Sequence, residues 1–504
     1  MKNVLVYSLY QQGYQEACQL QAAKDHIEEG DNVMYLTCSQ TCGCCSYNRQ
    51  VNGTVCKICN NYQKKRAAKY LGSNAVIRSL NDYLTKDIEN LANNISLEYS
   101  NVSELRKLKY EGVEIGYGVM SSYISWTRNM NPVLDDEFRS YIDYLLRMEV
   151  RLIEIVKTII KDFEPDLIVF HNGRYAHYKP VYGLALVNGI DYLCTETVTS
   201  YNGKVQKDDF VNSIPHDAEM CCSKHKSFWN NYSDLSERDA VGRMFFENKR
   251  HSKYAGDTIY TLGQKEGSLP NDIDNNKEKI VIFNSSEDEF AAVGSIVEKG
   301  ILFNDQYEAI KLIVEHYKND ESKQFILRVH PNLKKVRYEY HHKLYTLKYP
   351  NLKIIDANSD VSSYALMDIA DKVLVFGSSM GIESSYWGKP VLLLRFSIYR
   401  DLDVVYTPKT QEEMWQLLDT RDLPAKDQQN AMKFGLYYMS DKHTPFNICN
   451  LERKYVSLFG KKYLVSNFYH VLGSRRLFAF CDSLIQNLNA KLPVLCRFKK
   501  IPQE

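Results

Sequence analysis

Two stretches in the second half of the chain decide the fold. The first is Phe325-Ile-Leu-Arg-Val-His330-Pro331, and the second is Val373-Leu-Val-Phe-Gly-Ser378-Ser379-Met-Gly381-Ile-Glu383. Each begins as an apolar run typical of a buried strand, stops at small or polar residues and then enters a helical pattern. Ligands of open parallel α/β sheets bind outside the carboxyl ends of the strands. We therefore expect the polar residues after the two strands to share one ligand site.

These residue types suit the phosphate and ribose of a nucleotide. A charged His330, the hydroxyls of Ser378 and Ser379 and backbone N–H groups can stabilise a leaving phosphate without a metal. Gly381 lets the backbone approach a ligand closely, and Glu383 can accept ribose hydroxyls. The pair of strand ends thus predicts a nucleotide-sugar pocket. The alternative is a strand-end histidine beside two helix-capping serines.

A third polar strand end precedes these two. The segment reads Ile282-Phe-Asn284-Ser285-Ser286-Glu287-Asp-Glu289, at the end of a run that we predict as the first strand of the same sheet. Ser285 and Ser286 are candidates to bind the donor phosphate or the acceptor. The alternative is an ordinary helix start with acidic residues in its first turn.

The strand pattern predicts two α/β domains. Apolar runs at residues 4–9, 33–37, 166–170 and 190–195 form one series, and runs at residues 280–284, 324–329, 352–355, 372–376 and 391–394 form another. Two Rossmann-like domains joined by a linker make the GT-B layout. We predict an N-terminal acceptor domain at residues 1–255, a Gly- and Asn-containing linker at 256–278, a C-terminal nucleotide-sugar domain at 279–450, and a basic amphipathic segment at 451–504.

Composition excludes several classes of protein. The 504 residues are 44% hydrophobic and 25% charged, with a net charge of +1, so no basic field indicates nucleic-acid binding. The sequence lacks an apolar run near the roughly 20 residues of a transmembrane helix, and its N-terminus reads as a strand rather than a signal peptide. These features predict a cytoplasmic protein. The basic segment at 451–504 either lies on the cytoplasmic face of the inner membrane, where lipid-linked acceptors occur, or packs back on the N-terminal domain.

Six of the thirteen cysteines fall within residues 38–59, which we predict to be a metal-binding insertion in the N-terminal Rossmann-like domain. In a reducing compartment such a cluster favours metal binding over disulfides. Cys56-x-x-Cys59 is half of a zinc knuckle, and two of Cys38, Cys42, Cys44 and Cys45 would complete a tetrahedral thiolate site. A closed zinc site would be structural. An iron–sulfur cluster and buried free thiols are the alternatives.

The N-terminal domain offers candidates for a general base. Glu196 and His171 lie at predicted strand ends, and His216 follows in Ile214-Pro-His-Asp217. An inverting transferase needs a carboxylate or imidazole to take the proton of the acceptor hydroxyl. Arg174 can neutralise phosphate or an acidic sugar, and Glu16 is a weaker base candidate. A solvated or salt-bridged strand end is the alternative for Glu196.

The quoted motifs resemble a known family. Asn284-Ser-Ser-Glu-Asp-Glu289, Arg328-Val-His-Pro-Asn-Leu333 and Phe376-Gly-Ser-Ser-Met-Gly-Ile-Glu383 resemble bacterial GT-B glycosyltransferases of the capsule polysaccharide biosynthesis group. The His-Pro and Ser-Ser elements are also similar to those of bacterial polysialyltransferases and 3-deoxy-manno-octulosonate transferases. The resemblance runs through most of residues 1–450 and is strongest over 280–395.

The resemblance implies inverting transfer from a nucleotide-sugar donor to an oligosaccharide or lipid-linked glycan acceptor, in capsule or O-antigen synthesis. It implies donor-site roles for His330, Ser378, Ser379 and Glu383. A similar Asn-Gly-Arg … Glu … Pro-His-Asp series occurs in the family, although its glutamate is commonly followed by Arg-Gly, where this chain has Thr197-Val198. The family's cysteine pattern best matches one set of four thiols: Cys38, Cys45, Cys56 and Cys59. A nucleotide-sugar 2-epimerase on the same fold and a non-catalytic partner in a polysaccharide assembly complex are the alternatives.

Overall fold

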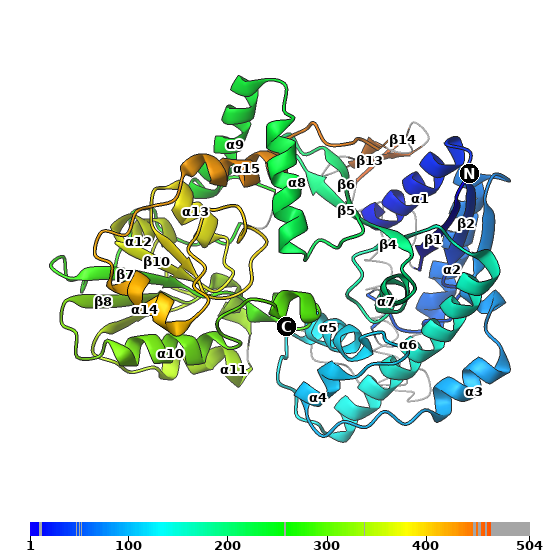
Figure 1. The fold of residues 1–504 in the computed structure, drawn as a ribbon, viewed down its shortest axis with the longest axis horizontal. Coiled ribbons are helices and arrows are strands. Elements are labelled where there is room, and N and C mark those ends of the chain that lie inside the picture. Colours follow the sequence, from blue (N-terminus) through cyan, green and yellow to red (C-terminus); the bar gives the residue numbers. More distant parts are fainter. Residues whose placement is uncertain are drawn as a thin grey trace. The chain divides into compact units, whose positions relative to one another are not determined.

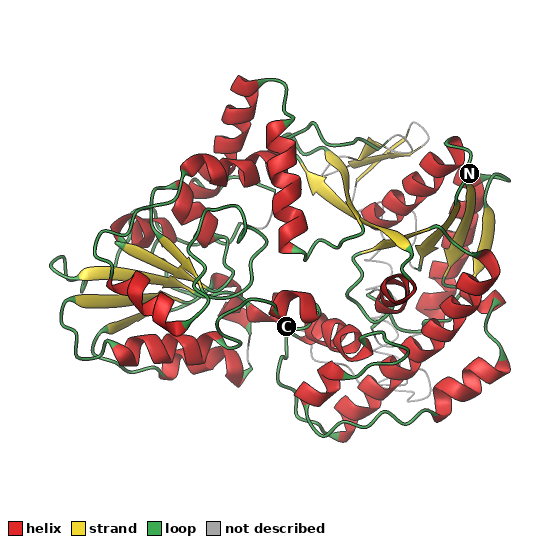
Figure 2. Cartoon of the chain, viewed as in Figure 1, coloured by secondary structure: helices red, strands yellow, loops and turns green. Residues whose placement is uncertain are grey.

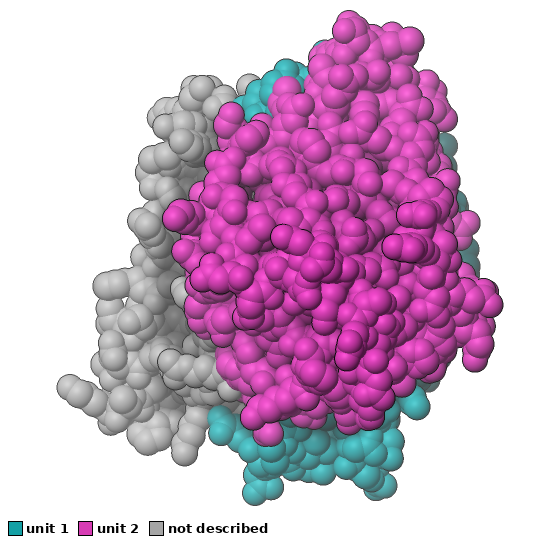
Figure 3. Space-filling view, turned by 90° about the vertical axis from the view of Figure 1, so that its left-hand side faces the viewer, with its two compact units in different colours: residues 1–215, 290–294, 441–504 teal, residues 216–289, 295–440 magenta. Residues whose placement is uncertain are grey.

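A computed structural model describes residues 1–9, 13–46, 48–49, 51, 53–256, 259–336, 338–446, 450–451, 455–458 and 461–464. The chain forms two compact units, coloured separately in Figure 3. Unit 1 comprises residues 1–215, 290–294 and the described residues from 441 onwards, and unit 2 comprises residues 216–289 and 295–440. Strands and helices alternate along both units (Figure 2), so each is an α/β structure.

Unit 1 is built on a six-stranded sheet in the order β3-β2-β1-β4-β5-β6. The strands are β1 (Asn3–Ser8), β2 (Asn32–Thr37), β3 (Val76–Ser79), β4 (Leu167–His171), β5 (Asp191–Thr199) and β6 (Val205–Val211). The first five pair in parallel, and β6 returns antiparallel to β5 at one edge. The order reverses between β1 and β4, which makes that point the topological switch of the sheet.

Helices join and cover these strands. They are α1 (Gly13–Glu28), α2 (Gly53–Leu71), α3 (Lys86–Asn94), α4 (Val102–Lys107), α5 (Ile115–Thr127), α6 (Asp136–Phe163) and α7 (Lys179–Asn188). Val4 and Val6 pack with α1 and α2 on one face of the sheet. Leu5 and Tyr7, equally buried, point to the opposite face because side chains alternate along a strand.

Unit 2 is built on a five-stranded, wholly parallel sheet in the order β11-β10-β7-β8-β9. The strands are β7 (Glu278–Phe283), β8 (Lys323–Arg328), β9 (Leu352–Ile355), β10 (Lys372–Val375) and β11 (Val391–Leu393). The chain starts at β7 in the centre, moves out to β9 and returns to β10 on the other side of β7. The switch point therefore lies between β7 and β10, where a ligand crevice is expected.

Helices cover both faces of this sheet. They are α8 (Ala218–Asn230), α9 (Leu235–Arg250), α10 (Gln306–His316), α11 (Glu339–His342), α12 (Ser363–Ile369), α13 (Met380–Tyr386), α14 (Gln411–Asp419) and α15 (Gln428–Met439). Val281 and Phe283 pack with α8, α9, α12, α13 and α15, whereas Ile280 and Ile282 pack with α10 and α14. Figure 1 shows α10 and α13 on opposite sides of the sheet.

The structure confirms the two series of parallel strands and corrects several details. The predicted strands of the first series do not include β3 (Val76–Ser79) or β6 (Val205–Val211). The strand predicted at 190–195 continues to Thr199 because β6 pairs along it, so Glu196 lies within β5. The predicted domain boundary at residue 255 also differs from the structure, since α8 and α9 pack in the core of unit 2.

The segment predicted as a linker is attached to unit 2. The backbone N–H of Lys265 donates to the Asp360 carbonyl at 2.7 Å, and that of Ser362 donates to the Ser268 carbonyl at 3.0 Å. These bonds hold the segment against the loop between β9 and α12. Residues 256–278 therefore form part of unit 2 rather than a free connection.

The C-terminal segment is described only in part. Three short strands, β12 (Asn450–Leu451), β13 (Tyr455–Leu458) and β14 (Lys461–Leu464), form an antiparallel meander. Most of the basic segment predicted at 451–504 lies outside the described residues, and so does its predicted contact with a membrane. In the described part of the chain, none of the helices combines the length and the apolar character that crossing a membrane requires.

Candidate functional site

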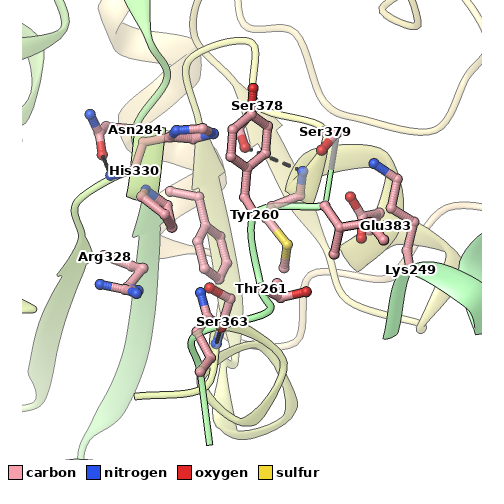
Figure 4. A pocket seen from close by; sticks show the side chains of 15 residues that line it. Lys249, Tyr260, Thr261, Asn284, Arg328, His330, Ser363, Ser378, Ser379 and Glu383 are labelled. Carbon is pink, nitrogen blue, oxygen red and sulfur yellow. Dashed lines mark hydrogen bonds between the residues drawn. The ribbon is translucent and has the colours of Figure 1, made fainter. Parts of the chain in front are cut away.

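A pocket with about 540 Å³ of empty space opens at the carboxyl ends of β7, β8 and β10, beside the switch point of unit 2 (Figure 4). Four of the residues predicted from the two strand ends line it: His330, Ser378, Ser379 and Glu383. They come together because β8 and β10 flank β7 and end at the same edge of the sheet. The pocket is thus where the sequence predicts a ligand site.

His330 is held by its neighbours on two loops. Its backbone N–H donates to Asn284 Oδ1 at 2.8 Å. This bond joins the end of β7 to His330, which lies two residues beyond the end of β8. The backbone N–H of Asn332 donates to His330 Nδ1 at 3.1 Å. Because Nδ1 accepts this bond, the proton of the neutral imidazole lies on Nε2. The ring of Tyr260 contacts that of His330 edge-on, with centroids 5.1 Å apart. His330 therefore offers an N–H donor to the pocket.

The loop from β10 to α13 supplies hydroxyls and a carboxylate. Ser378 and Ser379 follow the strand directly, and Ser378 Oγ accepts the backbone N–H of Met380 at 3.3 Å. Glu383 lies in the first turn of α13, is buried and accepts a hydrogen bond from the Tyr364 hydroxyl of α12. This places a fixed carboxylate in a wall of the same pocket.

Three other predicted residues lie near the pocket without lining it. The Ser285 hydroxyl donates to the Phe376 carbonyl at 2.9 Å, and the Ser286 hydroxyl donates to Asp288 Oδ1 at 2.7 Å. Both serines are buried and hold the loop after β7. A Cβ on Gly381 would collide with the Tyr399 hydroxyl and approach Val375 to 2.9 Å. Close packing against Tyr399 therefore explains this glycine without any ligand.

Sequence reasoning missed residues that reach the pocket from elsewhere in unit 2. They are Lys249, Tyr260, Thr261, Gln264, Arg328 and Ser363. Lys249 is in the last turn of α9, and Figure 4 shows its side chain next to Glu383. Tyr260, Thr261 and Gln264 come from the segment predicted as a linker. Only Arg328 carried a local signal, because it lies in β8 two residues before His330.

Arg328 is among the largest fully buried side chains of the molecule. Its Nη1 donates to the Asp356 carbonyl, and its Nη2 donates to the Ser359 carbonyl at 3.1 Å. Burial lowers the pKa of the guanidinium from its usual value. The two carbonyls lie in the loop after β9, so Arg328 fixes that loop against the pocket.

In unit 1 the structure brings two of the base candidates together. His171 ends β4, and its Nδ1 lies 2.8 Å from the Thr195 carbonyl and 3.8 Å from Glu196 Oε1. Both partners are acceptors, so Nδ1 carries the proton and Nε2 keeps the basic lone pair. The side-chain amide of Asn172 donates to Glu196 Oε1 at 3.0 Å. The side chains of His171 and Glu196 thus lie close together beside the switch point of unit 1, each held by a hydrogen bond to a different neighbour.

The remaining candidates are placed apart from this group or are engaged elsewhere. Arg174 donates to the Tyr175 hydroxyl at 2.7 Å, and its guanidinium lies 4.7 Å from the centre of the Tyr175 ring. Glu16 forms a buried ion pair with Arg66, and burial raises the pKa of this carboxyl. His216 begins unit 2. Arg174 lies in unit 1 and does not line the pocket of unit 2.

The cysteine segment surrounds a second cavity, in unit 1, with about 350 Å³ of empty space including its open side. Five thiols line it: Cys38, Cys42, Cys45, Cys56 and Cys59. Cys44 lies apart, with its Sγ 3.5 Å from the Tyr141 hydroxyl. Cys56 and Cys59 belong to α2, the ordinary crossover helix between β2 and β3. The predicted insertion at 38–59 is therefore limited to the segment before α2.

The donor set of this cavity fits a thiolate-bound metal. A hydrogen bond from the Cys42 thiol lowers the pKa of Cys38, which favours the thiolate form that metals bind. Among the described residues, however, no three of these thiols have sulfur atoms that all lie within 4.8 Å of one another. The group of potential metal ligands that meets this distance in the described residues is His26, Glu29 and Asp31. Ligation by four cysteines therefore requires the thiols to move inward.

Comparisons with known proteins place the fold in context. The chain matches no protein-family model, and no curated protein matches it by sequence. Its structure is similar to that of the Thermosulfurimonas dismutans KpsC β-Kdo 2,4-transferase, with a TM-score of 0.37 and 14% identity over 53% of this chain and 78% of that one. The KpsC β-Kdo 2,7-transferase of the same organism gives a TM-score of 0.31 and 15% identity over 56% and 80%.

A Neisseria meningitidis UDP-GlcNAc 2-epimerase, solved with UDP-GlcNAc, is similar with a TM-score of 0.25 and 12% identity over 86% of this chain and 97% of that one. At these values of identity and TM-score, an assignment of function rests on the residues of the site themselves. Those residues are the histidine, hydroxyl and carboxylate groups gathered at the switch point of unit 2.

Proposed function

We propose that the chain is a GT-B glycosyltransferase that transfers a sugar from a nucleotide donor to a saccharide acceptor in the synthesis of a bacterial surface polysaccharide. One observation carries the proposal. His330, Ser378, Ser379, Glu383 and Lys249 line a single pocket at the switch point of a parallel sheet. Such a position is where nucleotides bind in this class of sheet.

Each group has a role in the proposed reaction. The acceptor oxygen attacks the anomeric carbon of the donor as the bond from that carbon to the phosphate oxygen breaks, which inverts the configuration. The electron pair of that bond leaves with the nucleotide phosphate. His330 Nε2–H, the Lys249 ammonium and the serine hydroxyls stabilise this negative charge. Glu383, fixed by Tyr364, accepts the ribose hydroxyls.

Unit 1 supplies the proposed general base. Glu196 Oε1 lies 3.8 Å from His171 Nδ1, and either the carboxylate or the Nε2 lone pair of the imidazole can take the proton of the acceptor hydroxyl. His171 has the better-defined orientation because its Nδ1 is held by the Thr195 carbonyl. We further propose a structural zinc bound by Cys38, Cys45, Cys56 and Cys59, which would hold the segment between β2 and α2; an iron–sulfur cluster is the alternative.

A binding experiment tests the pocket independently of catalysis. Ligands that bind the native state raise its apparent stability. Thermal unfolding with CDP, CMP, UDP, GDP and TDP should show a rise in the unfolding midpoint for one or more nucleotides. The Lys249→Met variant should lose that rise, whereas Lys311→Met, in α10 and outside the pocket lining, should keep it. No rise with any nucleotide would contradict the proposal.

A further inference from the structure

The side chain of Gln264 presents a fixed hydrogen-bond donor to the pocket of unit 2. Its Oε1 accepts the backbone N–H of Ser363, the first residue of α12, at 2.8 Å. A backbone N–H can only donate, so the carbonyl oxygen of the amide must face it. The Nε2 group is therefore the other arm of the amide, and it cannot exchange places with Oε1 without breaking this bond.

The donor on Gln264 is buried and held in place. Its Nε2 has no hydrogen-bond partner among the residues that the structure describes, and it is shielded from solvent. The backbone is fixed on both sides of it, because the N–H of Gln264 donates to Thr261 at 2.9 Å and that of Lys265 donates to Asp360 at 2.7 Å. A buried donor without an acceptor is costly, and a ligand acceptor at this position removes the cost.

Arg328 adds a second donor of the same kind to the pocket lining. Its two terminal nitrogens are committed to the carbonyls of Asp356 and Ser359. Its Nε is buried and has no partner within the described part of the chain. Figure 4 shows Arg328, Ser363 and Thr261 at the end of the pocket away from Ser378 and Ser379. That end therefore offers N–H donors from two side chains.

We infer that this end of the pocket binds the nucleobase of the donor through a carbonyl oxygen of the base. The inference rests on the proposed function. With the phosphate at Ser378 and Ser379 and the ribose at Glu383, the base is the part of the nucleotide that reaches Gln264. Cytosine, uracil, thymine and guanine each carry a carbonyl oxygen, whereas adenine carries none and has only ring nitrogens as acceptors. The site then selects against adenine nucleotides.

Nucleoside monophosphates test this inference, because they contain the base, ribose and phosphate without the sugar. Isothermal titration of the full chain with CMP, UMP, TMP, GMP and AMP should give at least one keto nucleotide that binds about tenfold or more tightly than AMP, the factor expected from one hydrogen bond at a buried site. This comparison uses the unaltered protein and does not depend on the folding of a variant.

The Gln264→Glu variant reverses the polarity of the proposed contact. The carboxylate still accepts the Ser363 N–H but replaces the donor with an acceptor, so the preferred keto nucleotide should bind about tenfold or more weakly, with no such loss for AMP. Gln416→Glu makes the same change on an exposed face of α14 and should leave every affinity unchanged. Unfolding midpoints of both variants show whether the fold is kept.

The outcomes separate the inference from the function on which it rests. Binding of AMP as tight as that of the best keto nucleotide overturns the inference and leaves the proposed function standing. Equal weakening of AMP and the keto nucleotide by Gln264→Glu overturns it as well. Absence of binding by all five nucleotides overturns the proposed function, and the inference falls with it.

Discussion

Asn284 Oδ1 accepts the backbone N–H of His330 at 2.8 Å, and this single bond ties the end of β7 to the loop after β8. Asn284 is fully buried, so its amide has no solvent to compete for the bond. The bond fixes the backbone of His330, and the Asn332 N–H fixes its ring. The imidazole is therefore oriented before any ligand binds, as electrostatic stabilisation of a transition state requires.

The first prediction concerns His330 itself. Replacing it with alanine removes an oriented donor to the leaving phosphate, so kcat should fall by about 10²–10³, equivalent to about 2.7–4 kcal/mol. The unfolding midpoint should stay close to that of the unaltered protein. His316→Ala, at the exposed end of α10, is the matched control and should keep full activity. A folded His330→Ala protein with near-normal turnover excludes this residue from the mechanism.

The second prediction separates binding from chemistry at Glu383. Glu383→Gln should raise the KM for the donor more than it lowers kcat, because the carboxylate is assigned to the ribose. Tyr364→Phe removes the hydrogen bond that the Tyr364 hydroxyl donates to Glu383, so it should also raise the KM for the donor, by a smaller factor. Steady-state kinetics with varied donor measure both. A loss confined to kcat would reassign Glu383 to the reacting atoms.

The third prediction concerns the cysteine cavity. Purified protein should contain one zinc per chain, and Cys56→Ser or Cys59→Ser should abolish it because metal and local folding are coupled. Cys44→Ser is the matched control, since Cys44 lies against Tyr141 outside the cavity. Cys42 lines the cavity but is outside the proposed set, so Cys42→Ser should retain the metal.

Elemental analysis decides between the alternatives for this cavity. Detection of iron with inorganic sulfide would contradict the zinc assignment and support an iron–sulfur cluster. Protein without metal would leave the five cysteines as free thiols. Chelation gives a further check. Removal of a structural zinc should lower the unfolding temperature of unit 1 below that of unit 2.

The fourth prediction uses a buried carboxyl in unit 1. Glu149 of α6 is fully buried, and neither of its oxygens has a hydrogen-bond partner among the described residues. Burial raises the pKa of Glu149 well above its usual value, against the opposing charge of Lys179. A carboxyl with a raised pKa in the folded state contributes stability below its unfolded pKa of about 4.3 and loses it as the pH rises through the folded pKa.

Glu149→Gln should remove this loss, because glutamine stays neutral at every pH. The variant and the unaltered protein should unfold at similar temperatures near pH 4. As the pH rises, the unfolding temperature of the variant should exceed that of the unaltered protein by a growing amount. Thermal unfolding across the pH range measures the difference between the two unfolding temperatures. The contributions of the other titrating groups are the same in both proteins and cancel in this difference. A difference that stays constant with pH would contradict the assignment.

Much of the sheet could be predicted from the sequence because its central strands are buried on both faces. Residues 280–283 and 325–327 are apolar without interruption, as strands covered by helices on both sides must be. The edge strands of unit 1, β3 and β6, gave no such signal. β6 carries Gln206, Lys207, Asp208 and Asp209, which reads as a polar loop until β5 is seen to pair with it.

The pocket could be predicted only where its residues follow strands. His330 and Glu383 lie a few residues beyond β8 and β10, so the parallel sheet brings them together. Lys249 and Gln264 come from the end of α9 and the segment after it, and their position depends on how α9 packs on the sheet. No local pattern encodes that packing, because it depends on residues distant in the sequence.

The most direct test of the proposed function is release of free nucleotide from a sugar nucleotide as a function of saccharide acceptor. We expect free nucleotide to be released only when acceptor is present, in an amount equal to that of the elongated saccharide, and we expect this release to be lost in His330→Ala. An epimerase would instead interconvert the sugar nucleotides without acceptor and release none of the nucleotide. Conversion without acceptor, or no turnover of any nucleotide sugar that binds the pocket, would contradict the assignment of this chain as a glycosyltransferase.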